Sequence, residues 1–342
     1  MIIDTEFNSA AQVPIDICVR AAEEAERRGF GAVWKGESNS RDPLVMLSAM
    51  AARTERLALG TAIYHVFGRS PVTMGIQAAT LNELSRGRLI LGLGVGNEVI
   101  AGWHGERFER PLRLAREYVD IVRAVYSGQK LPDYVGERFA TRGGFRLAFE
   151  PPEYELPIWL AALGPQMARL AGKLCGGIII NMANGDMIAE IVKSFHEGAR
   201  EAGRDPSQLA VVSKIRVCLS DDVGAARWAL KKVLTFYCLQ RGYSDLLRRM
   251  GWSEVVDRVK QLHLTEGFTA ARRSIPDEMV DDVPMYAGRD LGGLPAKLAG
   301  HERAGVTRCI VACVPEAEDR QWEELSSFLR QAEPLVRSGH FA

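Results

Sequence analysis

The chain has 342 residues, 43 Lys and Arg against 43 Asp and Glu, and 47% hydrophobic residues, which is the composition of an ordinary globular protein. A net charge of zero gives no overall attraction to nucleic acid or to an anionic membrane surface. No apolar run approaches the roughly 20 residues that cross a bilayer, and the N-terminus lacks a signal-peptide pattern, so we expect a cytoplasmic protein.

Segments typical of strands and helices alternate along the chain. In chain order, we expect strand 2–7, helix 15–28, strand 31–34, helix 43–50, strand 57–63, helix 71–85, strand 88–93, helix 111–125, strand 158–162, helix 165–173, strand 177–181, helix 186–202, strand 209–219, a long helical region over 221–265, helix 292–304, strand 307–313 and helix 318–337. Residues 128–156 interrupt the alternation and could hold a short hairpin, and residues 266–290 are expected to be irregular.

The expected strands are continuous apolar runs, which is typical of parallel strands that are covered on both faces. Eight strand–helix units favour a closed (β/α)8 barrel, an α/β fold, over an open sheet. We expect one domain over 1–342 with insertions at about 128–156 and 221–290.

A dinucleotide-binding open sheet is the rival fold. Its G-x-G-x-x-G fingerprint should follow the first strand, whereas here G-x-G-x-G follows the fourth strand and Asn97 stands where the last glycine should be. We therefore disfavour that fold.

Metal and nucleophile chemistry have no sequence support. The six cysteines are scattered without a C-x2-C pair, and no cysteine, histidine or carboxylate cluster has the spacing of metal ligands. No G-x-S-x-G motif occurs. We expect buried, reduced thiols and no metal site.

In a barrel, functional groups gather at the carboxyl ends of the strands. That rule selects polar or small residues after six strands: Glu6 and Asn8; Glu37 and Ser38; Tyr64 and His65; Asn97 and Glu98, with Trp103 and His104 nearby; Leu163 and Gly164; and Asn181, Ala183, Asn184 and Gly185. The last two groups precede helices, where free backbone amides could hold a phosphate or the glycines could only form tight turns.

Three segments, 29–38, 78–94 and 157–165, together resemble the bacterial luciferase-like superfamily. Residues 102–111, with 116–119, are similar to its deazaflavin branch, which includes methylenetetrahydromethanopterin reductases. The resemblance implies a (β/α)8 barrel that binds coenzyme F420, or alternatively FMN, at the carboxyl end of the strands. It also implies hydride transfer with a small organic substrate and a homodimer formed through helices near strands 2–4.

The resemblance further implies roles for particular residues. Glu37 would lie near the cofactor ring, and a bulge with a cis peptide bond between Ala62 and Ile63 would support the ring. The cofactor-binding candidates are Glu37, Ser38, Ala62, Ile63, Tyr64, His65, Asn97, Leu163, Gly164, Asn181, Ala183, Asn184 and Gly185.

The sequence leaves three candidates for the catalytic acid. The strand 4 glutamate of the family falls near Asn97, so the proton donor could be Glu98, Glu37 or Glu6, and His65 is a further catalytic candidate. An FMN-dependent monooxygenase and a barrel without catalytic activity are the alternative functions.

Overall fold

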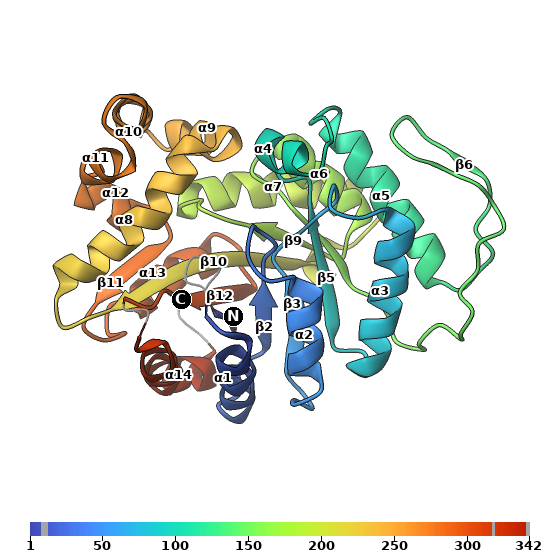
Figure 1. The fold of residues 1–342 in the computed structure, drawn as a ribbon, viewed down its shortest axis with the longest axis horizontal. Coiled ribbons are helices and arrows are strands. Elements are labelled where there is room, and N and C mark those ends of the chain that lie inside the picture. The colour runs from blue at the N-terminus through green and yellow to red at the C-terminus, as the bar shows by residue number, and fades with distance from the viewer. Residues whose placement is uncertain (8–12, 317–318, 340–342) are drawn as a thin grey trace.

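A closed ring of eight parallel strands forms the centre of the computed structural model, which describes residues 1–7, 13–316 and 319–339 (Figure 1). Around the ring the strands are β1 (Ile2–Phe7), β2 (Ala32–Lys35), β3 (Ala58–Thr61), β5 (Leu89–Gly94), β8 (Ile158–Ala161), β9 (Gly177–Ile180), β10 (Ala210–Leu219) and β12 (Arg308–Cys313). β12 pairs with β1 and with β10, which closes the ring. All eight predicted strands are present, and the predicted (β/α)8 barrel is confirmed.

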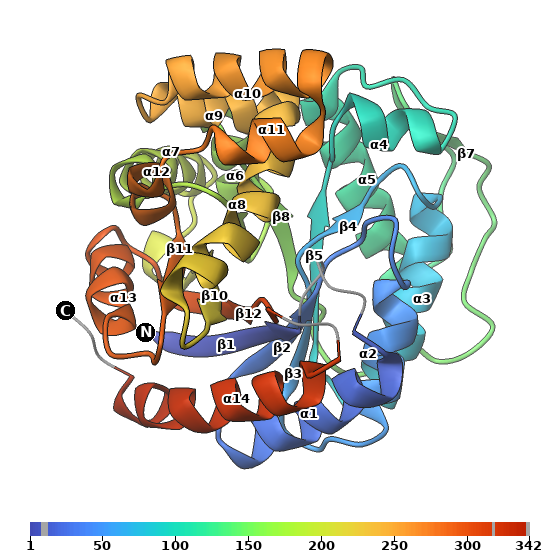
Figure 2. The same cartoon turned by 60° about the vertical axis from the view of Figure 1, so that its left-hand side comes forward.

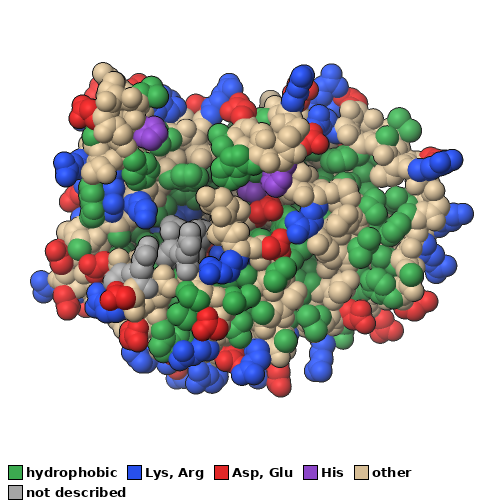
Figure 3. All heavy atoms as spheres, viewed as in Figure 1, with side chains coloured by type: hydrophobic (Ala, Val, Ile, Leu, Met, Phe, Trp, Pro, Cys, Tyr) green, Lys and Arg blue, Asp and Glu red, His purple; other side chains and the backbone are tan. Residues whose placement is uncertain are grey.

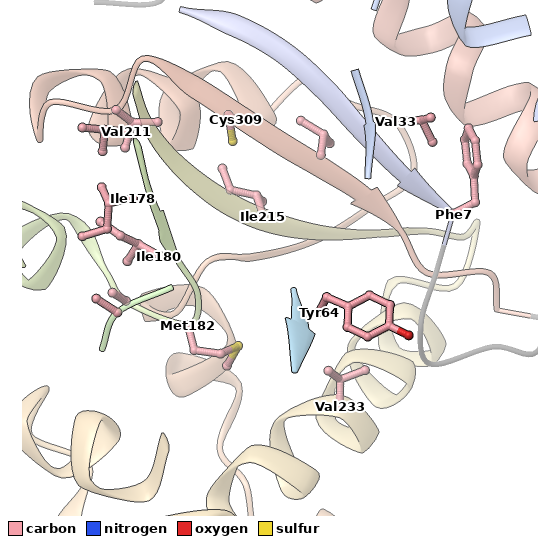
Figure 4. Packing of buried hydrophobic residues seen from close by; sticks show 14 of the residues in the cluster. Phe7, Val33, Tyr64, Ile178, Ile180, Met182, Val211, Ile215, Val233 and Cys309 are labelled. Carbon is pink, nitrogen blue, oxygen red and sulfur yellow. The ribbon is translucent and has the colours of Figure 1, made fainter. Parts of the chain in front are cut away.

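Helices surround the ring: α1 (Ile15–Arg27), α2 (Pro43–Ala51), α3 (Pro71–Leu84), α5 (Pro111–Tyr126), α6 (Pro165–Leu174), α7 (Gly185–Glu201), α13 (Leu294–Arg303) and α14 (Gln321–Ser338). A short helix, α4 (Glu98–Trp103), follows β5, and a 3-10 turn, η1 (Pro206–Gln208), precedes β10. The largest apolar cluster contains residues of both strands and helices, so it fills the layer between them. Figure 4 shows part of this layer, including Val33, Tyr64 and Ile215.

Two segments depart from the regular alternation. The predicted hairpin within 128–156 is present, because β6 (Tyr134–Val135) pairs antiparallel with β7 (Ala140–Thr141). The expected long helical region over 221–265 is three helices, α8 (Val223–Leu239), α9 (Arg241–Arg249) and α10 (Ser253–Glu266). The chain leaves helical geometry at Gln240 (ψ 124°) and at Gly251 (φ +92°), which ends α8 and α9.

The prediction that residues 266–290 are irregular is wrong. They form α11 (Phe268–Arg273), α12 (Asp277–Asp282) and a strand, β11 (Met285–Gly288), that pairs with the end of β10. Each of these elements is too short to display a hydrophobic period in the sequence. Figure 1 and Figure 2 both place α4, α9 and α10 at the same end of the barrel, so the segment after β10 covers the end where the strands finish.

A separate cluster of buried residues, all of them from strands, lies inside the barrel. The Trp34 and Trp159 rings lie 5.5 Å apart, centroid to centroid, and Trp34 Nε1 donates to Asp4 Oδ2 at 2.9 Å. Arg308 forms a two-point ion pair with Asp4, with distances of 2.9 and 2.8 Å. These side chains close the amino-terminal end of the barrel and leave the carboxyl-terminal end for chemistry.

His301 makes stability depend on pH. It lies on α13, is 6% exposed, and its Nδ1 is 2.7 Å from Ser213 Oγ on β10. Burial, helped by the charge of Lys297, lowers the pKa of His301 from 6.5 to about 4. As the pH falls below 6.5, the unfolded chain therefore binds a proton that the folded chain resists down to about pH 4, so stability is lost over that interval.

We expect His301→Gln to lose less stability on acidification than the wild type, by up to about 3 kcal/mol between pH 7 and pH 4. Glutamine does not titrate, and its amide can still contact Ser213. Urea unfolding at a series of pH values measures the difference. Parallel losses of stability in both proteins would show that His301 does not titrate in this way.

Candidate functional site

The ends of β2 and β3 form one corner of the candidate site. The Glu37 amide donates to the Ile63 carbonyl at 2.8 Å, and the His65 amide donates to Glu37 Oε2 at 2.7 Å. The bond between Ala62 and Ile63 is cis, which is the geometry that the resemblance implies. Burial raises the pKa of the Glu37 carboxyl, although the His65 hydrogen bond acts in the opposite direction. Glu37 is therefore a carboxyl group that retains its proton more readily than an exposed one.

His65 lies beside Glu37 at this corner, on β4 (Tyr64–His65). It is 8% exposed, and its Nδ1 is buried without a hydrogen-bond partner among the described residues. Burial lowers the pKa of His65 to about 4, so the ring is neutral near pH 7. An added Cβ at Gly96 would lie 2.9 Å from His65 Nδ1, and one at Gly68 would lie 3.2 Å from Glu37 Oε1. Glycine at both positions therefore leaves room for the two functional side chains.

The end of α4 brings a second histidine to this corner. His104, which ends α4, has its Cε1 3.4 Å from the position of the same added Cβ at Gly68. Figure 3 shows histidine side chains, in purple, beside acidic ones, in red, where Figure 1 places α4. The loop after β5 thus reaches back to the end of β2.

Two other candidates near this corner have side chains engaged elsewhere. The Tyr64 hydroxyl donates to Asp42 Oδ2 at 2.8 Å, and the side chain lies in the apolar layer around the barrel. The Ser38 hydroxyl donates to Ser40 Oγ at 2.9 Å. Asn8 lies outside the described residues.

Glu6 lies inside the barrel. Its side chain is 1% exposed and forms an ion pair with Lys214 of β10, which is 6% exposed. An ion pair buried on both sides is stable only while both partners are present. The Glu6 carboxylate therefore lies within the barrel interior, above Asp4, which is two residues earlier on the same face of β1.

The loop after β5 contacts the junction of α8 and α9. The Asn97 side chain caps α4 by accepting from the amides of Val99 and Ile100 at 2.9 and 3.0 Å. Its amide nitrogen donates to Gln240, and Glu98 forms an ion pair with Arg241 at 2.8 Å. The Glu98 side chain is 50% exposed, so of the three candidate carboxylates it is the one most open to solvent.

The two predicted phosphate-binding helix starts differ. α6 begins after Gly164, which has no side-chain cap and open space around its Cβ position. The preceding carbonyl of Leu163 accepts from Arg249 at 3.4 Å. The backbone amides at the start of α6 are thus available to an anion.

The start of α7 is partly occupied. Asn184 caps it by accepting from the Met187 amide at 3.2 Å and donates to Asp282 at 3.2 Å. Ala183 is buried, and Gly185 is the first residue of the helix. A carboxylate near this helix start makes it the less favourable of the two for an anion.

A polar cluster lies at the ends of β9 and β10. Sequence reasoning selected Asn181 in it but missed the other three members, Arg216, Tyr237 and Tyr243. Arg216 Nη1 donates to Asn181 Oδ1 at 2.9 Å, and Arg216 Nη2 donates to the Tyr237 hydroxyl at 2.7 Å. Asn181 Nδ2 donates to the hydroxyls of Tyr237 and Tyr243 at 3.2 and 3.0 Å. The sequence does contain a signal for this cluster. Lys214 and Arg216 are two cations in an otherwise largely apolar strand, and residues two positions apart lie on the same face of a strand.

Neither a metal centre nor a membrane-spanning helix is found in residues 1–7, 13–316 and 319–339. Those residues contain no group of three or more His, Cys, Asp or Glu arranged to hold a metal ion. No helix within them is long and apolar enough to span a membrane.

The chain is similar to known proteins along most of its length. The model of the family described as luciferase-like monooxygenase matches residues 4–308. A Mycobacterium tuberculosis protein named as a coenzyme F420-dependent oxidoreductase is 33% identical over 312 residues, which cover 86% of this chain and 88% of that protein. The 5,10-methylenetetrahydromethanopterin reductase of Archaeoglobus fulgidus is 29% identical over 87% of this chain and 89% of its own length.

A solved structure gives the same fold. The coenzyme F420-dependent tetrahydromethanopterin reductase of Methanopyrus kandleri superposes with a TM-score of 0.80 at 22% identity, covering 98% of this chain and all of that one.

Proposed function

Because the chain belongs to the family of luciferase-like monooxygenases, we propose that it is an oxidoreductase that transfers a hydride between coenzyme F420 and a small organic substrate. The observation that carries the proposal is the corner at the ends of β2 and β3, where Glu37 bonds to the backbone of Ile63 and His65. Relatives named as F420-dependent enzymes cover almost nine tenths of the chain, which supports this coenzyme over FMN.

The residues of the site suit a planar, anionic cofactor. His65 Nδ1 is buried and has no hydrogen-bond partner in the described part of the chain, so a ligand could supply one. The uncapped start of α6 at Gly164 offers backbone amides to a phosphate. The backbone of Ala62, Ile63 and Tyr64 would hold the ring, with Ser38, Asn97, Leu163, Asn181, Ala183, Asn184 and Gly185 completing the proposed cofactor-binding set.

F420 supplies the carbon that accepts or donates the hydride, and the protein supplies orientation and the proton. Glu37 is the best-placed proton carrier, because burial raises the pKa of its carboxyl group. Neutral His65, beside it, can form a hydrogen bond through Nδ1. Glu6 forms a buried ion pair with Lys214, and Glu98 forms a solvent-exposed ion pair with Arg241, so both are weaker candidates for the proton carrier.

The purified protein should bind oxidised F420 in preference to FMN. We expect saturable one-to-one F420 binding by calorimetry or fluorescence, with FMN at least about 100-fold weaker, a difference of roughly 3 kcal/mol. Tight FMN binding without F420 affinity would contradict the proposal. Oxygen uptake in the presence of reduced FMN would then favour the alternative, an FMN-dependent monooxygenase.

We further propose that the chain forms a homodimer in the cytoplasm. An apolar groove of about 220 Å³ lies between α2 and α3, and Val45 and Leu84 on its walls are 63% and 50% exposed. Such exposed apolar side chains suit a second copy of the chain. Light scattering of the purified protein measures its mass and so tests the dimer.

The proposed cytoplasmic location is supported by the cysteines. All six are free and buried, which suits a reducing compartment.

A further inference from the structure

Arg216 is a buried cation without a matching anion. Its side chain emerges from β10 toward the carboxyl end of the barrel, and the residue is only 5% exposed. In the described part of the chain no carboxylate forms an ion pair with it, whereas Lys214, two residues earlier on the same strand face, has Glu6. A buried charge is costly unless a counter-charge accompanies it. The uncompensated charge therefore suggests a missing anionic partner.

The hydrogen bonds around Arg216 lead to the same conclusion. A guanidinium has five N–H donors, and the acceptors it meets here are neutral: Asn181 Oδ1, the Tyr237 hydroxyl and, at 3.5 Å, Met182 Sδ. The hydroxyls of Tyr237 and Tyr243 both accept from Asn181 Nδ2, which leaves their own protons to donate. The cluster of Arg216, Asn181, Tyr237 and Tyr243 thus has more donors than acceptors.

The position of this cluster favours a substrate site. Arg216 and Asn181 belong to the strand ends β10 and β9, and the two tyrosines come from α8 and α9. Their rings lie 4.4 Å apart in an edge-to-face arrangement. The same α8–α9 junction contacts the loop after β5 through Gln240 and Asn97. The cluster therefore lies where the segment after β10 covers the barrel, across the ring from Glu37.

We propose that Arg216, with the hydroxyls of Tyr237 and Tyr243, binds a carboxylate or phosphate group of the substrate, so that the substrate is an organic acid or a phosphate ester. A carboxylate or phosphate supplies several acceptor oxygens and the missing negative charge, and a guanidinium can bind either group through two parallel bonds. The inference rests on the proposed function, because it places this group in the same barrel opening as the hydride transfer. The phosphate of F420 itself is the other source of the same chemistry.

The test uses inorganic phosphate and benzoate as probes, with neutral benzamide as the control ligand. Each is titrated by calorimetry into the protein with and without saturating F420. We expect phosphate and benzoate to bind both forms, benzamide to bind neither, and Arg216→Met to weaken anion binding roughly 10- to 100-fold. Arg216→Lys keeps the charge and should retain part of the anion affinity. It replaces Arg216→Met in this test if the Met variant does not fold.

A matched variant separates site binding from a general loss of positive charge. Arg169→Gln removes the same charge from an exposed ion-paired site on α6 and should bind both anions as the wild type does. Anion binding that depends on Arg216 and that F420 abolishes would assign Arg216 to the cofactor phosphate and overturn the substrate inference. Binding that Arg216→Met does not change, or no binding at all, would overturn it as well.

The same titrations give a different result if the proposed function is wrong. If the protein does not bind F420, while Arg216-dependent anion binding persists in the protein without cofactor, then the coenzyme assignment is wrong and the anion site stands.

Discussion

Replacing Lys214 with Met should lower the free energy of unfolding by roughly 3–5 kcal/mol. The Lys214 ammonium and the Glu6 carboxylate form an ion pair inside the barrel, with the side chains 6% and 1% exposed. Glu6 has no hydrogen bond from other described residues to compensate it. Removing the cation would therefore leave a carboxylate in a low-dielectric interior with no partner.

Urea unfolding followed by circular dichroism measures this effect, with the slope of the transition checked for constancy. The double variant Glu6→Gln, Lys214→Met is the control, because it removes both charges together. It should recover most of the lost stability, since a neutral pair carries no unpaired charge. If Lys214→Met alone unfolds at the same urea concentration as the wild type, the pair does not hold the interior together.

Replacing Glu37 with Gln should reduce turnover by roughly 10²- to 10⁴-fold, the range for loss of a general acid–base group. The side-chain oxygen of the introduced glutamine could still accept the bond from the His65 amide, so the corner should keep its shape and F420 affinity should change little. The assay follows oxidation of reduced F420 by any hydride acceptor that a screen of ketones, imines and activated alkenes identifies. Glu23→Gln is the matched control, because it makes the same chemical change at a carboxylate on α1 that pairs with Arg53 and belongs to no proposed site.

The pH dependence sharpens this test. Burial raises the pKa of Glu37, so the protonated carboxyl group persists to a higher pH than in an exposed glutamate. In the direction that reduces the organic substrate, activity should fall as the pH rises through that raised pKa, and this limb should vanish in Glu37→Gln. Equal activity and equal pH profiles for the two proteins would remove Glu37 from the proton transfer and leave Glu6 as the next candidate.

The barrel could be predicted from the sequence because its strands are covered on both faces. Continuous apolar runs such as 88–93 and 209–219, alternating with helical segments, are typical of parallel strands. The ends of those strands then selected Glu37 and His65, which the structure brings together by a hydrogen bond. Short helices such as α12 carry too few turns to show a period, so the segment after β10 was misjudged.

Contacts between distant segments could not be predicted from the sequence. The Glu98–Arg241 ion pair joins residues that are 143 positions apart. Because the sequence does not reveal this pair, Glu98 was interpreted as an unpaired carboxylate beside the cofactor. The Tyr64 side chain could not be oriented because β3 ends at Thr61 and β4 begins at Tyr64, so strand alternation does not carry across. Arg216 was hidden by its position inside a strand assumed to be wholly apolar.

A crystal structure of the protein with F420 bound is the most direct test of an F420-dependent oxidoreductase built on these strand ends. We predict that the deazaflavin ring lies against the backbone of Ala62 and Ile63 with Glu37 as its nearest carboxylate. The phosphate should lie at the start of α6 beside Gly164. A ring bound away from the ends of β2 and β3, or a protein that takes up no F420 at all, would contradict the proposed function.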